Sequence, residues 1–457
     1  MHRIATLCAI VLISALFLAR VFYARAEAND NLYDSDPDNA WNHLTATLFI
    51  RTAPDGTEYG LDTLDPLYWA RTKHLLEGDS LAAADRALDE FLDQHSEQLD
   101  PNPLKHAILQ RDLWALFDWA ATRNRFEQVP VDQPGVTALT SRLAAVIQRL
   151  ALTKSQINSL PDNYSDTLAS KAFPETFDPA HPDAGFLPPD LFQKDGPWVC
   201  VDIQHASLPA PYHTQQFGGR SIFLIFINLP NGRDQTLAYI NKLDHFPEPW
   251  IFDQQRMVEI FRAQPQALPA AMPHRFSALQ GPWVNPALPQ FPVGTQFALV
   301  RQTMLIDSAG ELVPTHLTEC VQIRRYQAID PAHTLGNEQL LFEFDLSRAN
   351  LFAGKAGGLR PVAKYEKGFT LLASNGIDPF ENQGNQPGQA PLMNCMGCHD
   401  GAGIHSVLSH SQLFATHSLI PPEYQDSDPS RLDQLTAGWK QDQFSWGLLK
   451  GLLPHAN

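Results

Sequence analysis

Residues 297–326 read FALVRQTMLIDSAGELVPTHLTECVQIRRY. The runs 297–306 and 317–326 are rich in β-type residues, and the sequence Asp-Ser-Ala-Gly at 307–310 lies between them. Two such runs around a short segment that contains Gly are typical of a β-hairpin. This stretch therefore predicts antiparallel strands in the middle of the chain.

The sequence around this hairpin keeps the same character from about residue 195 to 375. Residues 222–229 and 236–243 flank Pro-Asn-Gly-Arg at 230–233 and predict another hairpin. Two further runs that predict strands cover 338–346 and 362–372. We expect an antiparallel β domain over 195–375, arranged like a sandwich.

The chain before the sheet has helical periodicity. Asp65-Pro66 predicts the start of a helix and Gly78 its end, and Asn102-Pro103 predicts another start. We expect a helical bundle over 27–173. The apolar residues at helical spacing are Leu81, Ala84, Leu88, Phe91, Leu92, Leu109, Leu113, Leu116, Phe117, Ala120, Leu139, Leu143, Val146, Ile147 and Leu150.

Two segments complete the organisation. Five prolines lie within 174–190, a density that excludes a helix or a central strand, so we expect a linker over 174–194. In the last segment, 376–457, Asp428-Pro429 predicts the start of a helical pair. The expected fold class is α+β, with an N-terminal helical bundle, a central antiparallel β domain and a mostly helical C-terminal segment.

Composition excludes several classes of protein. The chain has 457 residues, of which 44% are hydrophobic, so it can fill a large core. Its 33 Lys and Arg against 50 Asp and Glu give a net charge of -17. We expect no binding to nucleic acid, because no basic excess neutralises phosphates.

The N-terminus has the layout of an export signal. Arg3 precedes an apolar run from Ile4 to Leu18, and Ala24-Arg25-Ala26 offers a cleavage site. The run is shorter than the ~20 apolar residues of a membrane span. We expect a signal peptide over 1–26 and a periplasmic or extracellular mature protein that does not span the membrane; an uncleaved anchor is the alternative.

The main functional signal is the sequence Cys395-Met396-Gly397-Cys398-His399. C-x-x-C-H is the attachment motif of haem c. The two thiols add across the two vinyl groups of one haem, and the adjacent histidine supplies an axial ligand of the iron. An export signal agrees with this interpretation, because covalent haem attachment in bacteria takes place outside the cytoplasm.

Residues 394–403 resemble the haem-attachment segment of c-type cytochromes, including the small residues at 401–403. The resemblance covers about ten residues. It implies one covalent haem c, held by Cys395 and Cys398, with His399 as the proximal ligand.

Other interpretations of this motif remain open. Zinc could bind Cys395 and Cys398 together with His405 or His410, although zinc sites of this type usually contain a second cysteine pair. The two cysteines could instead form a redox pair or a plain disulfide. A thioredoxin-like motif, however, needs a βαβ context, and the flanking residues are rich in Gly, Asn, Gln and Pro.

The second axial ligand has several candidates. No Met follows Met396, so the usual downstream Met is absent. The position could also be open. The side chains considered as ligands are His410, His417, Met272 and Met304; His405 is too close to His399 in sequence. His205 and His213 flank Pro-Ala-Pro at 209–211 and form at most a weak candidate metal pair.

Cys200 and Cys320 lie in strand-like stretches. In an oxidising compartment they could form a disulfide, and two buried thiols are the alternative.

These observations predict an exported monohaem c-type cytochrome that exchanges electrons with a redox partner protein. Two alternatives belong to other classes. One is a haem enzyme, peroxidase-like, with an open distal site. The other is a ligand- or partner-binding β domain with an accessory or sensory haem.

Overall fold

The computed structural model describes residues 32–53, 56–60, 62, 74–127, 133–204, 210–263, 283–330, 338–366, 380, 392, 395–396, 399, 402–408, 423–426 and 428–453. The expected signal peptide at 1–26 and the helix start at Asp65-Pro66 lie outside these residues. Within them, no helix has both the length and the apolar composition that crossing a membrane requires.

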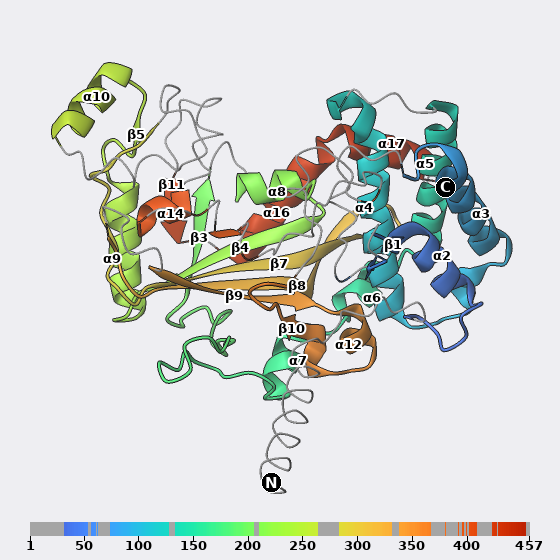
Figure 1. Ribbon diagram of the computed structural model, residues 1–457, viewed down its shortest axis with the longest axis horizontal. Coiled ribbons are helices and arrows are strands. Elements are labelled where there is room, and N and C mark those ends of the chain that lie inside the picture. The colour runs from blue at the N-terminus through green and yellow to red at the C-terminus, as the bar shows by residue number, and fades with distance from the viewer. Residues whose placement is uncertain are drawn as a thin grey trace, which may run out of the picture.

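A seven-stranded antiparallel sheet forms the centre of the molecule (Figure 1). Its order is β10-β9-β8-β7-β4-β3-β11. The strands are β3 (Val199–Gln204), β4 (Ser221–Asn228), β7 (Gln296–Ile306), β8 (Leu312–Tyr326), β9 (Gln339–Leu346), β10 (Leu359–Pro361) and β11 (Glu423–Asp426). β7 and β8 are the hairpin predicted at 297–326, and Gly310 in their turn has a φ of 77°, which Gly adopts without steric cost.

The pairing register sorts the residues of the sheet onto two faces. Residues directly opposite each other on paired strands share a face, and successive residues alternate. We call one face the Gln322 face; it carries Phe223, Ile225, Leu299, Arg301, Cys320, Gln322, Glu343 and Asp345. We call the other the Cys200 face; it carries Cys200, Leu224, Phe226, Ala298, Val300, Val321, Ile323, Phe342 and Phe344.

The predicted helical bundle is confirmed and lies at the right-hand end of the sheet in Figure 1. Its helices are α2 (Ala40–Phe49), α3 (Gly78–Asp93), α4 (Pro103–Glu127) and α5 (Gln133–Arg149), with α17 (Phe444–Leu452) packed on α4 and α5. Gly78 was expected to end a helix but begins α3. Its φ of 68° lets the chain turn into the helix, whose buried face follows at Leu81, Ala84 and Leu88.

The remaining helices surround the sheet. They are α6 (Lys154–Asn158), α7 (Asn163–Ala169), α8 (Pro211–Gln216), α9 (Arg233–Asp244), α10 (Gln254–Ala263), α12 (Arg348–Phe352), α14 (Ile404–Leu408) and α16 (Pro429–Gln441), with 3-10 turns at Ser96–Gln98 and Ala356–Gly358. Two small antiparallel pairs complete the described elements: β1 (Arg51–Thr52) with β2 (Glu58–Tyr59), and β5 (Trp250–Ile251) with β6 (Trp283–Val284).

The hairpin expected over 222–243 is wrong in its second half. Residues 221–228 form strand β4, but 233–244 form helix α9. The buried residues of α9 are Thr236, Tyr239, Ile240 and Leu243. Their spacing of three, four and seven is helical, and the apolar content alone had favoured a strand.

The α+β class is confirmed, but the central domain is not a sandwich in the described part of the chain, because helices and connecting segments cover its one large sheet. In the described part of the strand expected at 362–372, the structure differs: β10 ends at Pro361, and the chain turns at 363–366. Residues 367–372 lie outside the described residues. The C-terminal helical pair starting at Asp428-Pro429 is confirmed as α16 and α17. In addition, 423–426 add strand β11 beside β3.

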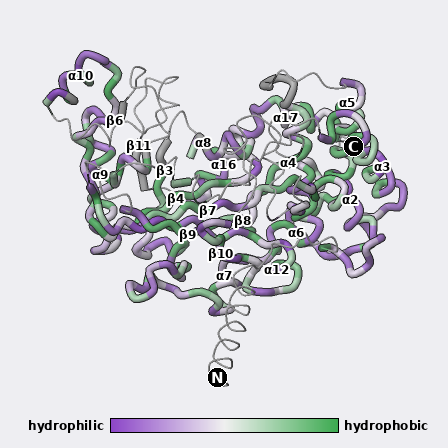
Figure 2. The backbone as a smooth tube through the Cα atoms, viewed as in Figure 1, coloured by the Kyte–Doolittle hydropathy of each residue, from purple (hydrophilic) through white to green (hydrophobic). Residues whose placement is uncertain are grey.

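One hydrophobic cluster joins the bundle to the Cys200 face of the sheet. It includes Leu113 and Trp114 of α4, Val300 of β7 and Leu449 of α17. The described residues of 174–194 form no helix or strand, as their prolines predicted, and Phe186 of this segment is buried in the same cluster. Figure 2 shows hydrophobic residues along the bundle and the central strands, whereas α10 is largely hydrophilic.

Candidate functional site

The structure describes two residues of the C-x-x-C-H motif, Cys395 and His399, and Cys398 lies outside the described residues. The backbone N–H of His399 donates to the carbonyl of Cys395 over 3.0 Å. This is the spacing of one helical turn, which puts side chains four residues apart on the same side. A thiol and an imidazole are thereby brought to one side of a short helical segment.

The imidazole of His399 is held in one tautomer. Its Nδ1 lies 2.8 Å from the carbonyl oxygen of Ser406, and a carbonyl can only accept, so Nδ1 carries the proton. The lone pair is therefore on Nε2. A hydrogen bond from the far ring nitrogen to a backbone carbonyl is the usual arrangement of a metal-ligating histidine.

Neighbouring strands anchor this histidine. The Gln339 side chain of β9 donates to the carbonyl of His399 over 2.9 Å. The Ser406 hydroxyl lies 2.5 Å from the hydroxyl of buried Tyr326 in β8, so the residue that orients the imidazole is itself fixed to the sheet. His399 is therefore connected to strands β8 and β9 by hydrogen bonds.

Close packing explains the glycine at position 403. Gly403 has a φ of 56°, and a Cβ added there would lie 2.1 Å from Oε1 of Gln290. The Gln290 side chain bonds the backbone of this segment at both ends, donating to the carbonyl of Ala402 over 3.2 Å and accepting from the N–H of Ile404 over 3.0 Å. A larger side chain at position 403 would displace Gln290 and break these two hydrogen bonds.

The motif lies against the Gln322 face of the sheet. Nε2 of Gln322 lies 3.5 Å from Sγ of Cys395. On the same face, the cross-strand neighbours Ile225 and Leu299 continue the row that contains Gln322, and Phe223 lies in the adjacent row. Phe223 is already buried against Ala210 and Phe217, whereas Ile225 and Leu299 are only partly buried. Burying the remaining apolar surface of Ile225 and Leu299 against a hydrophobic group would be favourable.

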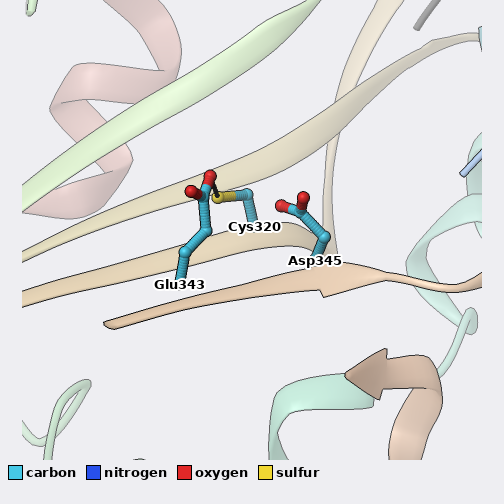
Figure 3. Close-up of side chains that lie close together, drawn as sticks. All are labelled: Cys320, Glu343 and Asp345. Atoms are coloured by element: carbon cyan, nitrogen blue, oxygen red, sulfur yellow. Dashed lines mark hydrogen bonds between the residues drawn. The ribbon is translucent and has the colours of Figure 1, made fainter. Parts of the chain in front are cut away.

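A buried cluster of one thiol and two carboxyls lies beside Gln322 (Figure 3). Cys320, Glu343 and Asp345 each offer one ligand atom, and these atoms lie within 4.8 Å of one another. Gln322 donates to Oε1 of Glu343 over 2.9 Å. Burial and the adjacent Asp345 raise the pKa of Glu343 to about 7. Among the described residues, these three side chains form the group that is arranged so that it could hold a metal ion. The spacing of the three residues in the sequence does not match a metal-binding motif, so the sequence did not predict this group.

The structure brings His213 close to the motif histidine. The rings of His213 and His399 are parallel within 6°, and their centroids are 6.3 Å apart. His213 also stacks on Phe223 of β4, with centroids 5.4 Å apart. The sequence had linked His213 only with His205, which lies outside the described residues. No local pattern relates positions 213 and 399, so only the fold reveals this pair.

The other expected ligands fall elsewhere. His410, His417 and Met272 lie outside the described residues. Met304 is fully buried in the hydrophobic cluster of the Cys200 face. His405 is also buried, which lowers its pKa to about 4 and keeps it neutral. Cys398, which the expected zinc site with His405 also requires, lies outside the described residues.

The structure contradicts the Cys200–Cys320 disulfide. Neither thiol is in a disulfide, and both residues are buried. Cys200 is on β3 and Cys320 is on β8, on opposite faces, with β4 and β7 between them. At about 4.8 Å per strand this separation is roughly 14 Å, whereas a disulfide needs Cα atoms within about 7 Å.

Comparison with protein-family models, with curated proteins and with solved structures finds no match to this chain.

Proposed function

We propose that this protein is an exported monohaem c-type cytochrome that transfers electrons through a haem bound covalently to Cys395 and Cys398. The observation that carries the proposal is the complete C-x-x-C-H sequence together with the Nδ1 bond from His399 to Ser406, which places the lone pair of the ring on Nε2. A bound haem would supply a one-electron Fe(III)/Fe(II) couple.

The residues of the chain would each have a distinct role. Cys395 and Cys398 would hold the group by thioether bonds. His399 would ligate the iron, with Ser406 and Gln339 as positioning residues. One side of the haem would be shielded from water by Phe223, Ile225 and Leu299. Excluding water lowers the local dielectric constant, which strengthens the electrostatic interactions at the haem. A redox partner protein would supply or accept the electron.

Covalent attachment is tested by producing the full chain in a bacterial host that attaches haem to exported proteins. After denaturing electrophoresis, the band should stain for haem, and the alkaline pyridine spectrum should be that of a haem with two thioether bonds. The double variant Cys395→Ser/Cys398→Ser should lose the stain. The matched control Cys200→Ala removes a thiol outside the motif and should keep it.

A wild-type band that carries no haem would overturn the proposal. The electron-transfer role is tested separately by a spectroscopic redox titration, which should show one reversible single-electron step. Rapid binding of carbon monoxide by the reduced wild-type protein would instead favour the peroxidase-like or sensory alternative with an open distal site.

A further inference from the structure

We propose that His213 is the second axial ligand of the iron, opposite His399. The inference rests on the proposed function, since it concerns the same haem. It is carried by the pair of parallel imidazoles, whose centroids lie 6.3 Å apart. The two imidazoles are far apart in sequence: His213 lies on α8, and His399 is the last residue of the C-x-x-C-H motif.

The spacing of the rings fits a metal ion shared between them. A histidine nitrogen binds a metal at about 2.0–2.1 Å, and the centre of the ring lies about 1.1–1.2 Å behind that nitrogen, so two histidines on opposite sides of one metal have centroids about 6.2–6.6 Å apart. The 6.3 Å between His213 and His399 falls in this range. The Nδ1 bond of His399 to Ser406 leaves Nε2 as the ligating atom on that side.

The position of His213 is built into the local structure. Pro211 occupies the first turn of α8, where its fixed φ is favourable, and Ala210 before it has a φ of 41°, which turns the chain into the helix. His213 then stacks on Phe223, at an interplanar angle of 28°, and Phe223 is itself 3% exposed. Phe223 is therefore a positioning residue for the imidazole.

Two histidine ligands would have defined consequences. Six-coordinate, low-spin iron leaves no open position, which favours an electron carrier over a peroxidase-like enzyme. The potential would also lie below that of a site with a histidine and a methionine, because a methionine ligand raises it. Met304, one candidate methionine, is packed in the cluster of the other sheet face.

The experiment compares wild type with His213→Ala and with the control His245→Ala, whose histidine is exposed at the end of α9. The wild-type protein should be low-spin in both oxidation states and should not bind carbon monoxide on mixing. Its oxidised form should give an electron paramagnetic resonance spectrum with three resolved g values, as parallel imidazole planes do. His213→Ala should keep covalent haem, become high-spin and bind carbon monoxide, and added imidazole should restore the low-spin spectrum. His245→Ala should match wild type.

The outcomes separate the two proposals. Haem-stained His213→Ala with an unchanged low-spin spectrum overturns the assignment of His213 while covalent haem attachment stands. A wild-type protein without covalent haem overturns both. If His213→Ala does not accumulate, His213→Met provides the second test: a methionine ligand should keep the iron low-spin and raise the potential, and an unchanged potential contradicts the assignment.

Discussion

Two buried glutamates on adjacent strands have pKa values shifted in opposite directions, because their neighbours differ. Burial by itself raises the pKa of Glu319, but Arg111 and Arg301 beside it hold that pKa at about 2. Glu343 is buried with Asp345 next to it, and these two effects raise its pKa to about 7 despite the hydrogen bond from Gln322. Nearby charge, and not burial alone, thus decides the charge of a buried carboxyl.

The raised pKa of Glu343 predicts a loss of stability as the pH rises. Above about pH 4.5 an unfolded chain releases this proton, whereas the folded protein keeps it until about pH 7. The free energy of unfolding should fall across this window by up to about 1.4 kcal/mol per pH unit. Glu343→Gln, which keeps an oxygen for Gln322, should therefore gain stability over wild type between pH 4.5 and 7.

Urea unfolding at pH 4.5, 6 and 8 measures this difference. The control Glu259→Gln changes an exposed carboxyl on α10 and should show no such trend. A stability difference for Glu343→Gln that stays constant with pH would contradict the raised pKa.

At the scale of an element, the alternation of residues along a strand decides which cysteines can meet. Cys200 pairs with Phe226 on one face, and Cys320 pairs with Asp345 on the other. Burial and the nearby carboxyls of Asp345 and Glu343 raise the pKa of Cys320, which keeps it a thiol. The oxidising compartment expected from the sequence would have allowed a disulfide between Cys200 and Cys320, but the sheet geometry forbids it.

Thiol labelling tests this arrangement. Unfolded but unreduced protein treated with iodoacetamide should carry the label at both Cys200 and Cys320, because the two residues are not bonded to each other. The native protein should react much more slowly, since both residues are buried. Mass spectrometry of the peptides identifies the labelled sites. A cross-linked peptide that contains both Cys200 and Cys320 would contradict the strand register described above.

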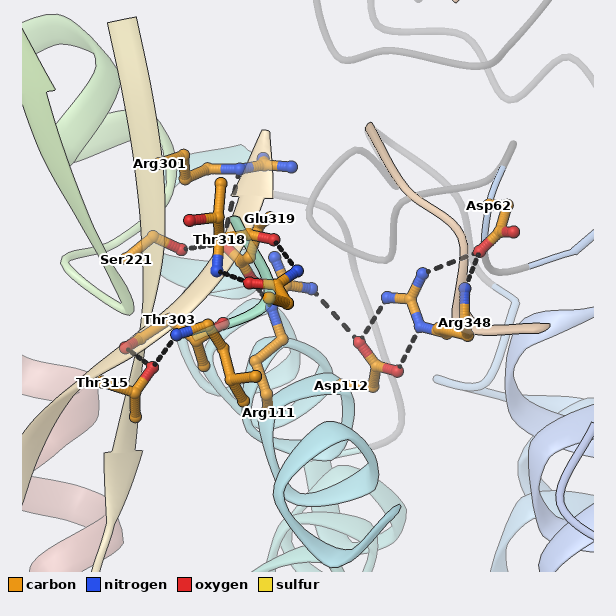
Figure 4. Close-up of polar contacts among 12 residues, drawn as sticks. Asp62, Arg111, Asp112, Ser221, Arg301, Thr303, Thr315, Thr318, Glu319 and Arg348 are labelled. Carbon is orange, nitrogen blue, oxygen red and sulfur yellow. Dashed lines mark hydrogen bonds and ion pairs between the residues drawn. The ribbon is translucent and has the colours of Figure 1, made fainter. Parts of the chain in front are cut away.

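At the scale of the whole molecule, buried ion pairs join the bundle to the sheet (Figure 4). Arg111 of α4 pairs with Glu319 of β8, and Ser221 of β4 donates to the same carboxylate over 2.6 Å. Arg301 of β7 lies 3.3 Å from it. Behind Arg111, Asp112 binds Arg348 at 2.7 Å. These contacts connect helix α4 to strands β4, β7 and β8 and to helix α12.

Glu319→Gln should therefore destabilise the protein by about 3–5 kcal/mol at pH 7, because it leaves buried Arg111 and partly buried Arg301 without this carboxylate. The depressed pKa of Glu319 means that its contribution is present above about pH 4.5 and is lost as the pH falls toward 2. The difference between wild type and variant should shrink over that range.

Urea titrations at pH 7 and 3.5 give both values. Glu311→Gln is the matched control: its carboxylate is 61% exposed and pairs with Lys450 at the surface, so it should cost less than about 1 kcal/mol. Equal costs for the two variants would show that the buried network contributes no more than a surface pair.

Much of the fold and of the candidate site followed from the sequence alone. Helical spacing predicted α3, α4 and α5, Asp428-Pro429 predicted the start of α16, and 297–326 predicted the β7–β8 hairpin. C-x-x-C-H identified Cys395, Cys398 and His399, because the chemistry of the motif depends only on residues adjacent in sequence.

Tertiary structure decided everything that depends on residues far apart in the chain. Strand register put Cys200 and Cys320 on opposite faces, and packing against the sheet made 233–244 a helix where its apolar content had suggested a strand. The pairing of His213 with His399 has the same origin. Local patterns report local backbone preference, but which side chains meet across a sheet follows only from strand order and register, and no single segment contains that information.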